Sequence, residues 1–391
     1  MTGIRCCVLV LTLCVVQSAV LKQSVADPGF EDESTFRFHT SELVPREAIK
    51  GPNYELDPET SLHDGRFVFR IRTTWGVLVA HGKPMLVLRL REMDTIERAR
   101  KMNREPQLIG SFLNTLVDSR KGAELLLTDP VGSVLRVPAG IGKGLNELLS
   151  PANRKSGGEV RRRVAAQLDC DPETTNPILS ALLDWIAVRQ GVGGVAGKVG
   201  LHLVLPGLAL IPTTAQFKEQ LADESPAELN IRIERELVEL GFDPKLSQKF
   251  VRESGLTTLQ RMMVVEQLKS LRGVSGHNLL LRRGVTIEKT ADAMNFLHEL
   301  LLLNQIHTRQ QVVDVVDLKY PLVTVENGQQ LVVCTAGYLV DDQPLHKFTT
   351  SCRAVLKQPA ADLHGSVRLS DKARATLDGI GVRRLPTPES N

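Results

Sequence analysis

The stretch RFVFRIRTTWGVLVAHG, residues 66–82, decides how the first part of the chain folds. Apolar and basic residues alternate from Arg66 to Arg72, which is the period of a strand that buries one face. A second apolar run, 75–82, follows after two threonines, so the pattern predicts a β-hairpin. One face of this hairpin would carry the aromatic and branched side chains, and the other face the arginines.

From Pro84 onward the pattern becomes helical, because apolar residues recur at a spacing of three or four. The residues that carry this period are Leu86, Leu90, Met93 and Ile96. Aromatic residues make up only 4% of the chain, so the core must be built mostly from Leu, Val and Ala. That composition favours helices.

Several later helices follow from apolar periodicity and from polar starts. They are expected at 107–127, 177–190, 225–241, 257–271 and 286–307. Asp-Pro pairs at Asp129, Asp171 and Asp243 also predict helix starts, because Asp caps free amides and Pro fits the first helical position.

After about residue 310 the chain becomes rich in valine and other strand-forming residues. Asn327-Gly328 stands between two valine-rich runs, which is a strong hairpin signal. The segments 346–357 and 365–370 are predicted as further strands, and 371–377 as a short helix. The fold class expected is therefore α+β, with a predominantly helical middle and β-hairpins near the N- and C-terminal ends.

The first 26 residues are typical of a signal peptide. Arg5 precedes a short apolar run that ends at Val16, and small residues follow up to Ala26. The run is too short to span a bilayer, which needs about 20 residues. We therefore expect export to the periplasm or the medium. The remaining divisions expected are an N-terminal arm at 27–60, a hairpin plus helical domain at 61–310, a β-rich C-terminal region at 311–385 and a disordered tail at 386–391.

Charge and cysteine content exclude some classes of protein. The formal net charge of +3 falls to +1 if Arg5 and Lys22 leave with the leader, which gives no electrostatic case for nucleic acid. The cysteines that remain are Cys170, Cys334 and Cys352, too few for a disulfide scaffold and wrongly spaced for a metal site. Cys334 and Cys352 are candidates for a disulfide in an oxidising compartment.

Two glycine-rich segments, 130–150 and 191–212, are the candidate interaction surface. The first looks like a phosphate-binding loop, but Val137 stands where that loop needs glycine and Gly144 where it needs a hydroxyl. The second is nearly apolar and is interrupted by Pro206. Its small residues permit close helix packing, contact with a membrane, or a ligand-lined groove. The residues singled out are Pro138, Gly140, Gly142, Lys143, Gly144, Gly193, Gly197 and Gly200.

Acid–base and metal motifs are weak. His298-Glu299 begins like a zinc-protease helix, but Leu302 occupies the position of the second histidine. Asp169-Cys170-Asp171 has the carboxylate spacing of a calcium loop without the downstream ligands, and it is interpreted as a helix cap. No metal or cofactor is therefore expected. His63, Asp64 and His81 leave an exported hydrolase as an alternative, although Asp64-Gly65 is more often a turn.

Three short parts of the chain resemble exported bacterial proteins of unknown function. These parts are 125–144, 171–177 and 369–382. The resemblance implies a bacterial exported protein and supplies no activity.

The function expected from these features is non-enzymatic: a cell-envelope or secreted scaffold or interaction module. Its partner would be an unidentified protein or envelope component, and not nucleic acid. One alternative is a membrane-associating protein that docks its glycine-rich apolar helices at 130–150 and 191–212 in peripheral contact with a bilayer. The other alternative is the exported hydrolase.

Overall fold

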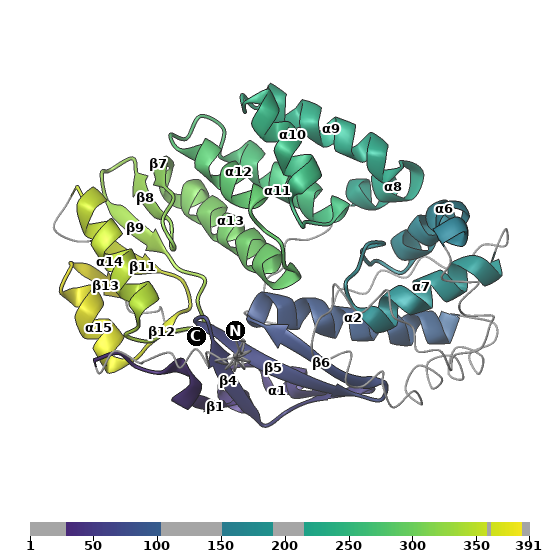
Figure 1. Ribbon diagram of the computed structural model, residues 1–391, viewed down its shortest axis with the longest axis horizontal. Coiled ribbons are helices and arrows are strands. Elements are labelled where there is room, and N and C mark those ends of the chain that lie inside the picture. The colour runs from purple at the N-terminus through teal and green to yellow at the C-terminus, as the bar shows by residue number, and fades with distance from the viewer. Residues whose placement is uncertain (1–28, 103–150, 191–214, 358–360, 385–391) are drawn as a thin grey trace, which may run out of the picture. The chain divides into compact units, whose positions relative to one another are not determined.

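The structure is a computed structural model that describes residues 29–102, 151–190, 215–357 and 361–384 (Figure 1). The chain divides into a short unit that ends at Phe30 and a second unit that begins at Glu31. The second unit has strands near both of its ends and helices between them. The predicted α+β class is confirmed.

An antiparallel sheet forms the start of the second unit. Its strands are β1 (Arg37–His39), β2 (Lys50–Gly51), β3 (Tyr54–Leu56), β4 (Glu59–His63), β5 (Arg66–Thr73) and β6 (Gly76–His81). β5 pairs with β6 along one edge and with β4 and then β3 along the other. The hairpin predicted from 66–82 is confirmed. Phe67, Phe69 and Ile71 are buried, whereas Arg70 and Arg72 are exposed.

The segment expected to be an arm, 27–60, instead contributes strands β1 to β3, part of β4 and the short helix α1 (Arg46–Ile49). Its first part is held by side chains. The Glu33 carboxylate accepts the backbone N–H groups of Asp64 and Gly65 at 2.6 and 2.7 Å. The Glu31 carboxylate accepts the N–H of Asp341 at 2.8 Å. These partners lie far along the chain, so no local sequence pattern predicts that this first part is ordered.

The helical middle begins after Gly82, whose φ of 88° suits glycine. Its helices are α2 (Lys83–Met102), α6 (Pro151–Gln167), α7 (Pro177–Gln190), α8 (Ala215–Asp223), α9 (Pro226–Glu239), α10 (Pro244–Glu253), α11 (Thr258–Ser270), α12 (His277–Val285) and α13 (Thr290–Gln310). α13 contacts α2, α11 and the strands β7 and β9 (Figure 1). α2 also contacts β6 and α7, so α2 and α13 join the first sheet to the rest of the second unit.

Helix starts follow the capping signals in part. Asp243 caps α10 and accepts the N–H of Leu246 at 2.9 Å, as predicted. The pair at Asp171 does not begin a helix. Asn176 caps α7 instead, accepting the N–H groups of Ile178 and Leu179 at 3.0 and 3.3 Å.

The C-terminal part contains a mixed sheet in the order β13-β11-β9-β8-β7. These strands are β7 (Val312–Val316), β8 (Leu322–Val325), β9 (Gln330–Val333), β11 (Ala361–His364) and β13 (Val382–Arg384). β7, β8 and β9 are antiparallel, whereas β9, β11 and β13 are parallel. A smaller parallel pair joins β10 (Tyr338–Leu339) to β12 (Arg368–Leu369). The turn predicted at Asn327-Gly328 is confirmed, with Gly328 at a φ of 86°.

The strand predicted at 346–357 is wrong, because this segment belongs to helix α14 (Gln343–Val355). Asp342 caps the helix and accepts the N–H of Leu345 at 2.8 Å. Leu345, Phe348 and Cys352 are buried along one side. The period is helical, but the β-branched pair Thr349 and Thr350 obscured it. α14 and α15 (Asp371–Asp378) supply the crossovers that parallel strands require.

No helix among the described residues is both long enough and apolar enough to cross a membrane. The two candidate interaction segments, 130–150 and 191–212, lie wholly outside the described residues. The structure therefore gives no placement for any of the eight residues singled out in these two segments. The membrane-docking alternative therefore stays a prediction.

Candidate functional site

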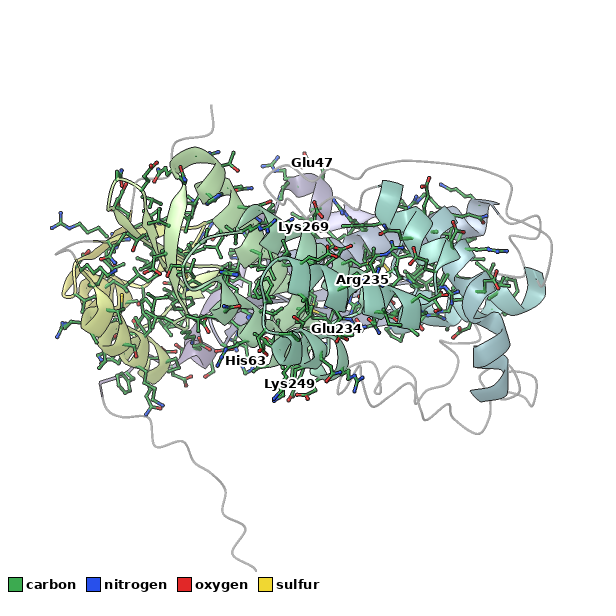
Figure 2. The ribbon with its side chains drawn as sticks, turned by 90° about the horizontal axis from the view of Figure 1, so that it is seen from above. Glu47, His63, Glu234, Arg235, Lys249 and Lys269 are labelled. Carbon is green, nitrogen blue, oxygen red and sulfur yellow. The ribbon has the colours of Figure 1, made fainter. Side chains whose placement is uncertain are left out.

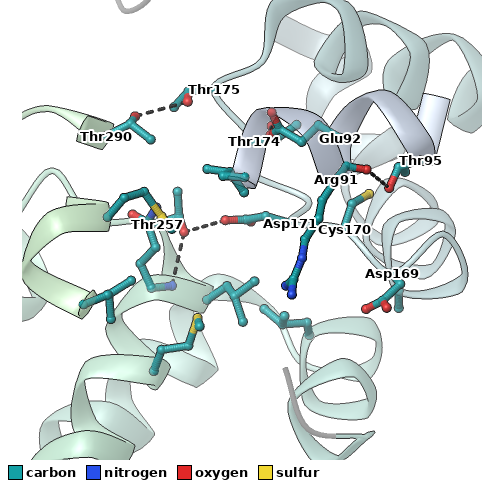
Figure 3. Close-up of a pocket in the computed structure, with 18 residues that line it drawn as sticks. Arg91, Glu92, Thr95, Asp169, Cys170, Asp171, Thr174, Thr175, Thr257 and Thr290 are labelled. Atoms are coloured by element: carbon teal, nitrogen blue, oxygen red, sulfur yellow. Dashed lines mark hydrogen bonds between the residues drawn. The ribbon is translucent and has the colours of Figure 1, made fainter. Parts of the chain in front are cut away.

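A cavity of about 100 Å³ lies where α2, the loop between α6 and α7, α8, α11 and α13 meet (Figure 3). Its apolar lining comes mainly from leucines and methionines of the helices. Its polar lining includes five threonines, the Cys170 thiol and the charged side chains of Arg91, Glu92, Asp169 and Asp171. Charged groups in so small a space require hydrogen-bond or ion-pair partners, and most of these groups have them.

The loop after α6 is tied to the start of α11 by two carboxylates. The Asp171 carboxylate accepts the Glu173 N–H at 2.8 Å and the Thr257 hydroxyl at 2.6 Å. The Glu173 carboxylate accepts both the N–H and the hydroxyl of Thr258, at 2.5 and 3.0 Å. Negative charge at a helix N-terminus is favourable. Asp171, expected to cap a helix, accepts no backbone N–H of a described helix: Thr257 caps α11, Glu173 accepts the N–H of its first residue, and Asp171 holds the Thr257 hydroxyl.

A second set of contacts joins the loop to α2. The buried Glu92 carboxylate pairs with Arg89 at 2.7 Å, and it accepts the Asn176 amide at 3.1 Å and the Thr174 hydroxyl. Arg89 also donates to the Thr175 hydroxyl at 2.9 Å. A buried ion pair is tolerable when further hydrogen bonds satisfy its remaining atoms. Glu92 is therefore a structural group, although it lines the cavity.

Arg91 and Asp171 differ from Glu92 and Arg89 in that neither makes an ion pair in the described chain. Within the described chain the Arg91 guanidinium makes no hydrogen bond or ion pair, and Asp171 has no cation within ion-pair distance. Burial lowers the pKa of Arg91, although the charge of Asp169 opposes this. Burial raises the pKa of Asp171 to about 6, and the charges of Glu173 and Glu92 add to this while the Thr257 hydroxyl opposes it. Both side chains are drawn at the cavity in Figure 3.

Cys170 is the thiol in the cavity wall. It donates a weak hydrogen bond to the Ala165 carbonyl oxygen at 3.6 Å. Burial raises its pKa far above the ordinary range for a thiol, and the nearby Asp171 and Glu92 add to the effect. The thiolate is the nucleophilic form of cysteine, so Cys170 is poorly suited to covalent chemistry here.

The residues of the hydrolase alternative lie at the first sheet. His63 is exposed (Figure 2), and its ring centroid lies 6.2 Å from that of His81. Asp64 occupies the β4–β5 turn at a φ of 50°, and its carboxylate lies 3.6 Å from Lys319. Burial, with the charges of His63 and Arg66, lowers the pKa of His81. Among the described residues no hydrogen bond joins Asp64 to either histidine, so the turn interpretation fits the geometry better.

The residues of the incomplete zinc-protease motif are buried in α13. Glu299 pairs with Arg283 at 2.8 Å, and Arg283 lies 3.6 Å from Asp317. Burial raises the pKa of Glu299 to about 7, against the opposing effect of Arg283. In the described part of the chain no cluster of three or more His, Cys, Asp or Glu side chains could hold a metal ion.

Cys334 and Cys352 are free thiols in the structure, and both are buried in the hydrophobic cluster of the C-terminal part. Burial raises the pKa of the two thiols, to about 12 and about 11. The disulfide stays a prediction.

Comparison with known proteins gives no relative for this chain: no family model, no curated protein and no solved structure matches it. The site must therefore be interpreted from its own geometry.

Sequence reasoning missed Arg91, which was one charged residue within a charged helical stretch. A signal was present, since Arg91 and Glu92 follow directly on the buried Leu90. Charged residues next to the buried apolar face of a helix indicate either an ion pair or a polar cavity. On α2 both occur at adjacent positions: Glu92 pairs with Arg89, and Arg91 lines the cavity.

Proposed function

We propose that the chain is an exported, non-enzymatic protein that works by binding, and that the cavity beside α2 is its binding site. One observation carries the proposal: Arg91 and Asp171 line one cavity, and neither makes an ion pair in the described chain. Both residues are half-buried, and a charged side chain that is partly withdrawn from water gains from a ligand that supplies the opposite charge. Most other polar groups of the cavity hold the surrounding elements together.

The non-enzymatic part of the proposal is supported by the state of the nucleophilic and acid–base groups. The Cys170 thiol resists ionisation, because burial raises its pKa. Glu92 is held in its ion pair with Arg89. His63, Asp64 and His81 lie at the first sheet and do not line this cavity. The hydrolase alternative has no comparable geometric support.

Export rests on the sequence of the first 26 residues, and the resemblance to exported bacterial proteins agrees with it. The proposed location is the periplasm or the medium, with an unidentified protein or envelope component as the partner. Fractionation of an expressing bacterium, followed by sequencing of the purified N-terminus, tests this. We expect a soluble product that begins near Asp27. Release from membranes only by carbonate would support the membrane-docking alternative instead.

Binding is tested by thermal unfolding of the full chain against a panel of small metabolites, with mass spectrometry of each ligand after incubation. We expect at least one compound to raise the Tm and to be recovered unchanged, because a ligand that binds only the native state stabilises it by mass action. Chemical conversion of a stabilising compound would contradict the non-enzymatic assignment.

A further inference from the structure

We propose that the cavity binds a small zwitterionic α-amino acid, whose carboxylate pairs with Arg91 and whose ammonium group pairs with Asp171. The inference rests on the proposed binding role and names the class of ligand.

The carboxylate end of the ligand is assigned by Arg91. This guanidinium comes from α2, lines the cavity and has no hydrogen-bond acceptor among the described residues. Guanidinium groups bind carboxylates with two parallel hydrogen bonds. The Thr175 hydroxyl lies in the same wall and accepts hydrogen bonds from Arg89 at 2.9 Å and Thr290 at 3.1 Å. Its own proton is left to donate to a ligand oxygen.

The ammonium end is assigned by Asp171. Two donors already hold this carboxylate in position, the Glu173 N–H and the Thr257 hydroxyl. Both are neutral, so the negative charge keeps acceptor capacity and no ion-pair partner in the described chain. Arg261 of α11 acts on Asp171 electrostatically without forming an ion pair, whereas a ligand ammonium group supplies three donors and a positive charge at hydrogen-bond distance.

A ligand with a single charge suits the cavity less well. A simple carboxylate would satisfy Arg91 but would face Asp171 and Asp169 at close range. A simple amine would satisfy Asp171 but would leave Arg91 unpaired. Arg91 and Asp171 are not within 4 Å of each other as an ion pair, yet they line one small space. A molecule that carries both charges on adjacent groups bridges them.

The size and the apolar part of the cavity limit the side chain of the amino acid. The volume of about 100 Å³ is smaller than an engineered cavity of about 150 Å³ that holds benzene. Its apolar wall includes Leu88, Leu259, Met263 and Met294. The ligand expected is therefore of the size of glycine, alanine or serine.

The charge of Asp171 makes binding depend on pH. The ionisable groups around it come from α2, the loop between α6 and α7, and α11. They are Arg91 and the paired Glu92 on α2, Asp169, Cys170 and Glu173 in the loop, and Arg261 on α11. The lining residues of α8 and α13 are not ionisable. Because burial raises the pKa of Asp171 to about 6, the carboxylate is charged at pH 7 and loses its charge below pH 6.

Calorimetric titration of the full chain tests the ligand class. Glycine, L-alanine and L-serine are compared at pH 7 with acetate, propionate, ethylamine and L-alaninamide, at up to about 10 mM because so small a ligand has limited affinity. We expect an amino acid to bind at least about tenfold more tightly than every analogue that lacks one charge. Arg91→Gln should weaken amino-acid binding by about tenfold or more, whereas Arg100→Gln, on the same helix but outside the cavity, should bind as the wild type does.

The outcomes separate this inference from the function on which it rests. A carboxylate or an amine that binds as tightly as the amino acid overturns the zwitterion assignment and leaves the binding role standing. No binding of any compound in the panel overturns the assignment as well, and the wider metabolite panel then decides the binding role. Arg91→Gln loses no internal hydrogen bond in the described chain, so it should fold, and its Tm checks this. If it does not fold, the comparison of ligands on the wild type still decides.

Discussion

The Glu173 carboxylate accepts both the backbone N–H and the hydroxyl of Thr258, so a residue of the loop between α6 and α7 closes the first turn of α11. Thr257 caps the same helix through the N–H of Gln260 at 3.2 Å. The loop that carries Asp171 is thereby fixed against α11. One wall of the cavity depends on this contact.

Removing the charge of Glu173 should weaken this attachment. We expect Glu173→Gln to lower the free energy of unfolding by about 1 kcal/mol, because a charged acceptor at a helix N-terminus is replaced by a neutral one. Urea unfolding followed by circular dichroism measures the change. Glu239→Gln, at the exposed C-terminal end of α9, is the control and should change stability little. Equal effects of the two substitutions would contradict the capping role.

Substitution of Glu92 should lower the free energy of unfolding far more than substitution of Glu173, because it leaves the buried Arg89 without its ion-pair partner. Glu92→Ala deprives Arg89 of its ion-pair partner and Thr174 and Asn176 of their acceptor. Breaking a buried pair from one side costs about 3 kcal/mol or more. Asp94→Asn, which loses only the pair with Arg98 on the same helix, should cost less than about 1 kcal/mol. Chemical denaturation of both variants tests this, and similar values for the two would show that the Glu92 contacts are not structural.

Glu299 should make stability depend on pH near neutrality. Because the folded protein raises the pKa of Glu299 to about 7 from 4.5, the folded state binds this proton more tightly than the unfolded state does. The stability that this group contributes is present below about pH 4.5 and is lost as the pH rises through about 7. The side chain of Glu299→Gln cannot titrate. The difference between the free energies of unfolding of the wild type and of this variant, measured by urea unfolding, should therefore shrink by about 2 kcal/mol between pH 5 and pH 8. A difference that is constant, or that grows with pH, would contradict this.

Local patterns predicted the parts of the fold that local interactions determine. The alternation in 66–82 predicted the β5–β6 hairpin, and Asn327-Gly328 predicted the β8–β9 turn, because strand period and turn chemistry are read from neighbouring residues. The strands before residue 60 were missed, since β1 to β3 have only two or three residues each, too few to show a period, and β1 and β3 pair with later strands. α14 was assigned as a strand because two threonines outweighed its capping residue.

The candidate site could not be assembled from sequence. Arg91 and Asp171 belong to separate elements, and no spacing rule connects them. The sequence indicated Asp171 as a helix cap, whereas its carboxylate holds the hydroxyl of Thr257, which is the residue that caps α11. The cavity arises from the packing of several helices around one loop, and within the described residues that packing leaves Arg91 and Asp171 without an ion pair.

The measurement that tests the amino-acid site most directly is the affinity for L-alanine at pH 7 and at pH 5, in the wild type and in Asp171→Asn. The ligand keeps both charges across this range, whereas burial raises the pKa of Asp171 to about 6. The wild type should bind about tenfold more weakly at pH 5, because only about a tenth of Asp171 remains ionised. Asp171→Asn should bind weakly and equally at both pH values. Wild-type affinity that does not change between pH 7 and pH 5, or an Asp171→Asn variant that binds as tightly as the wild type at pH 7, would contradict the site.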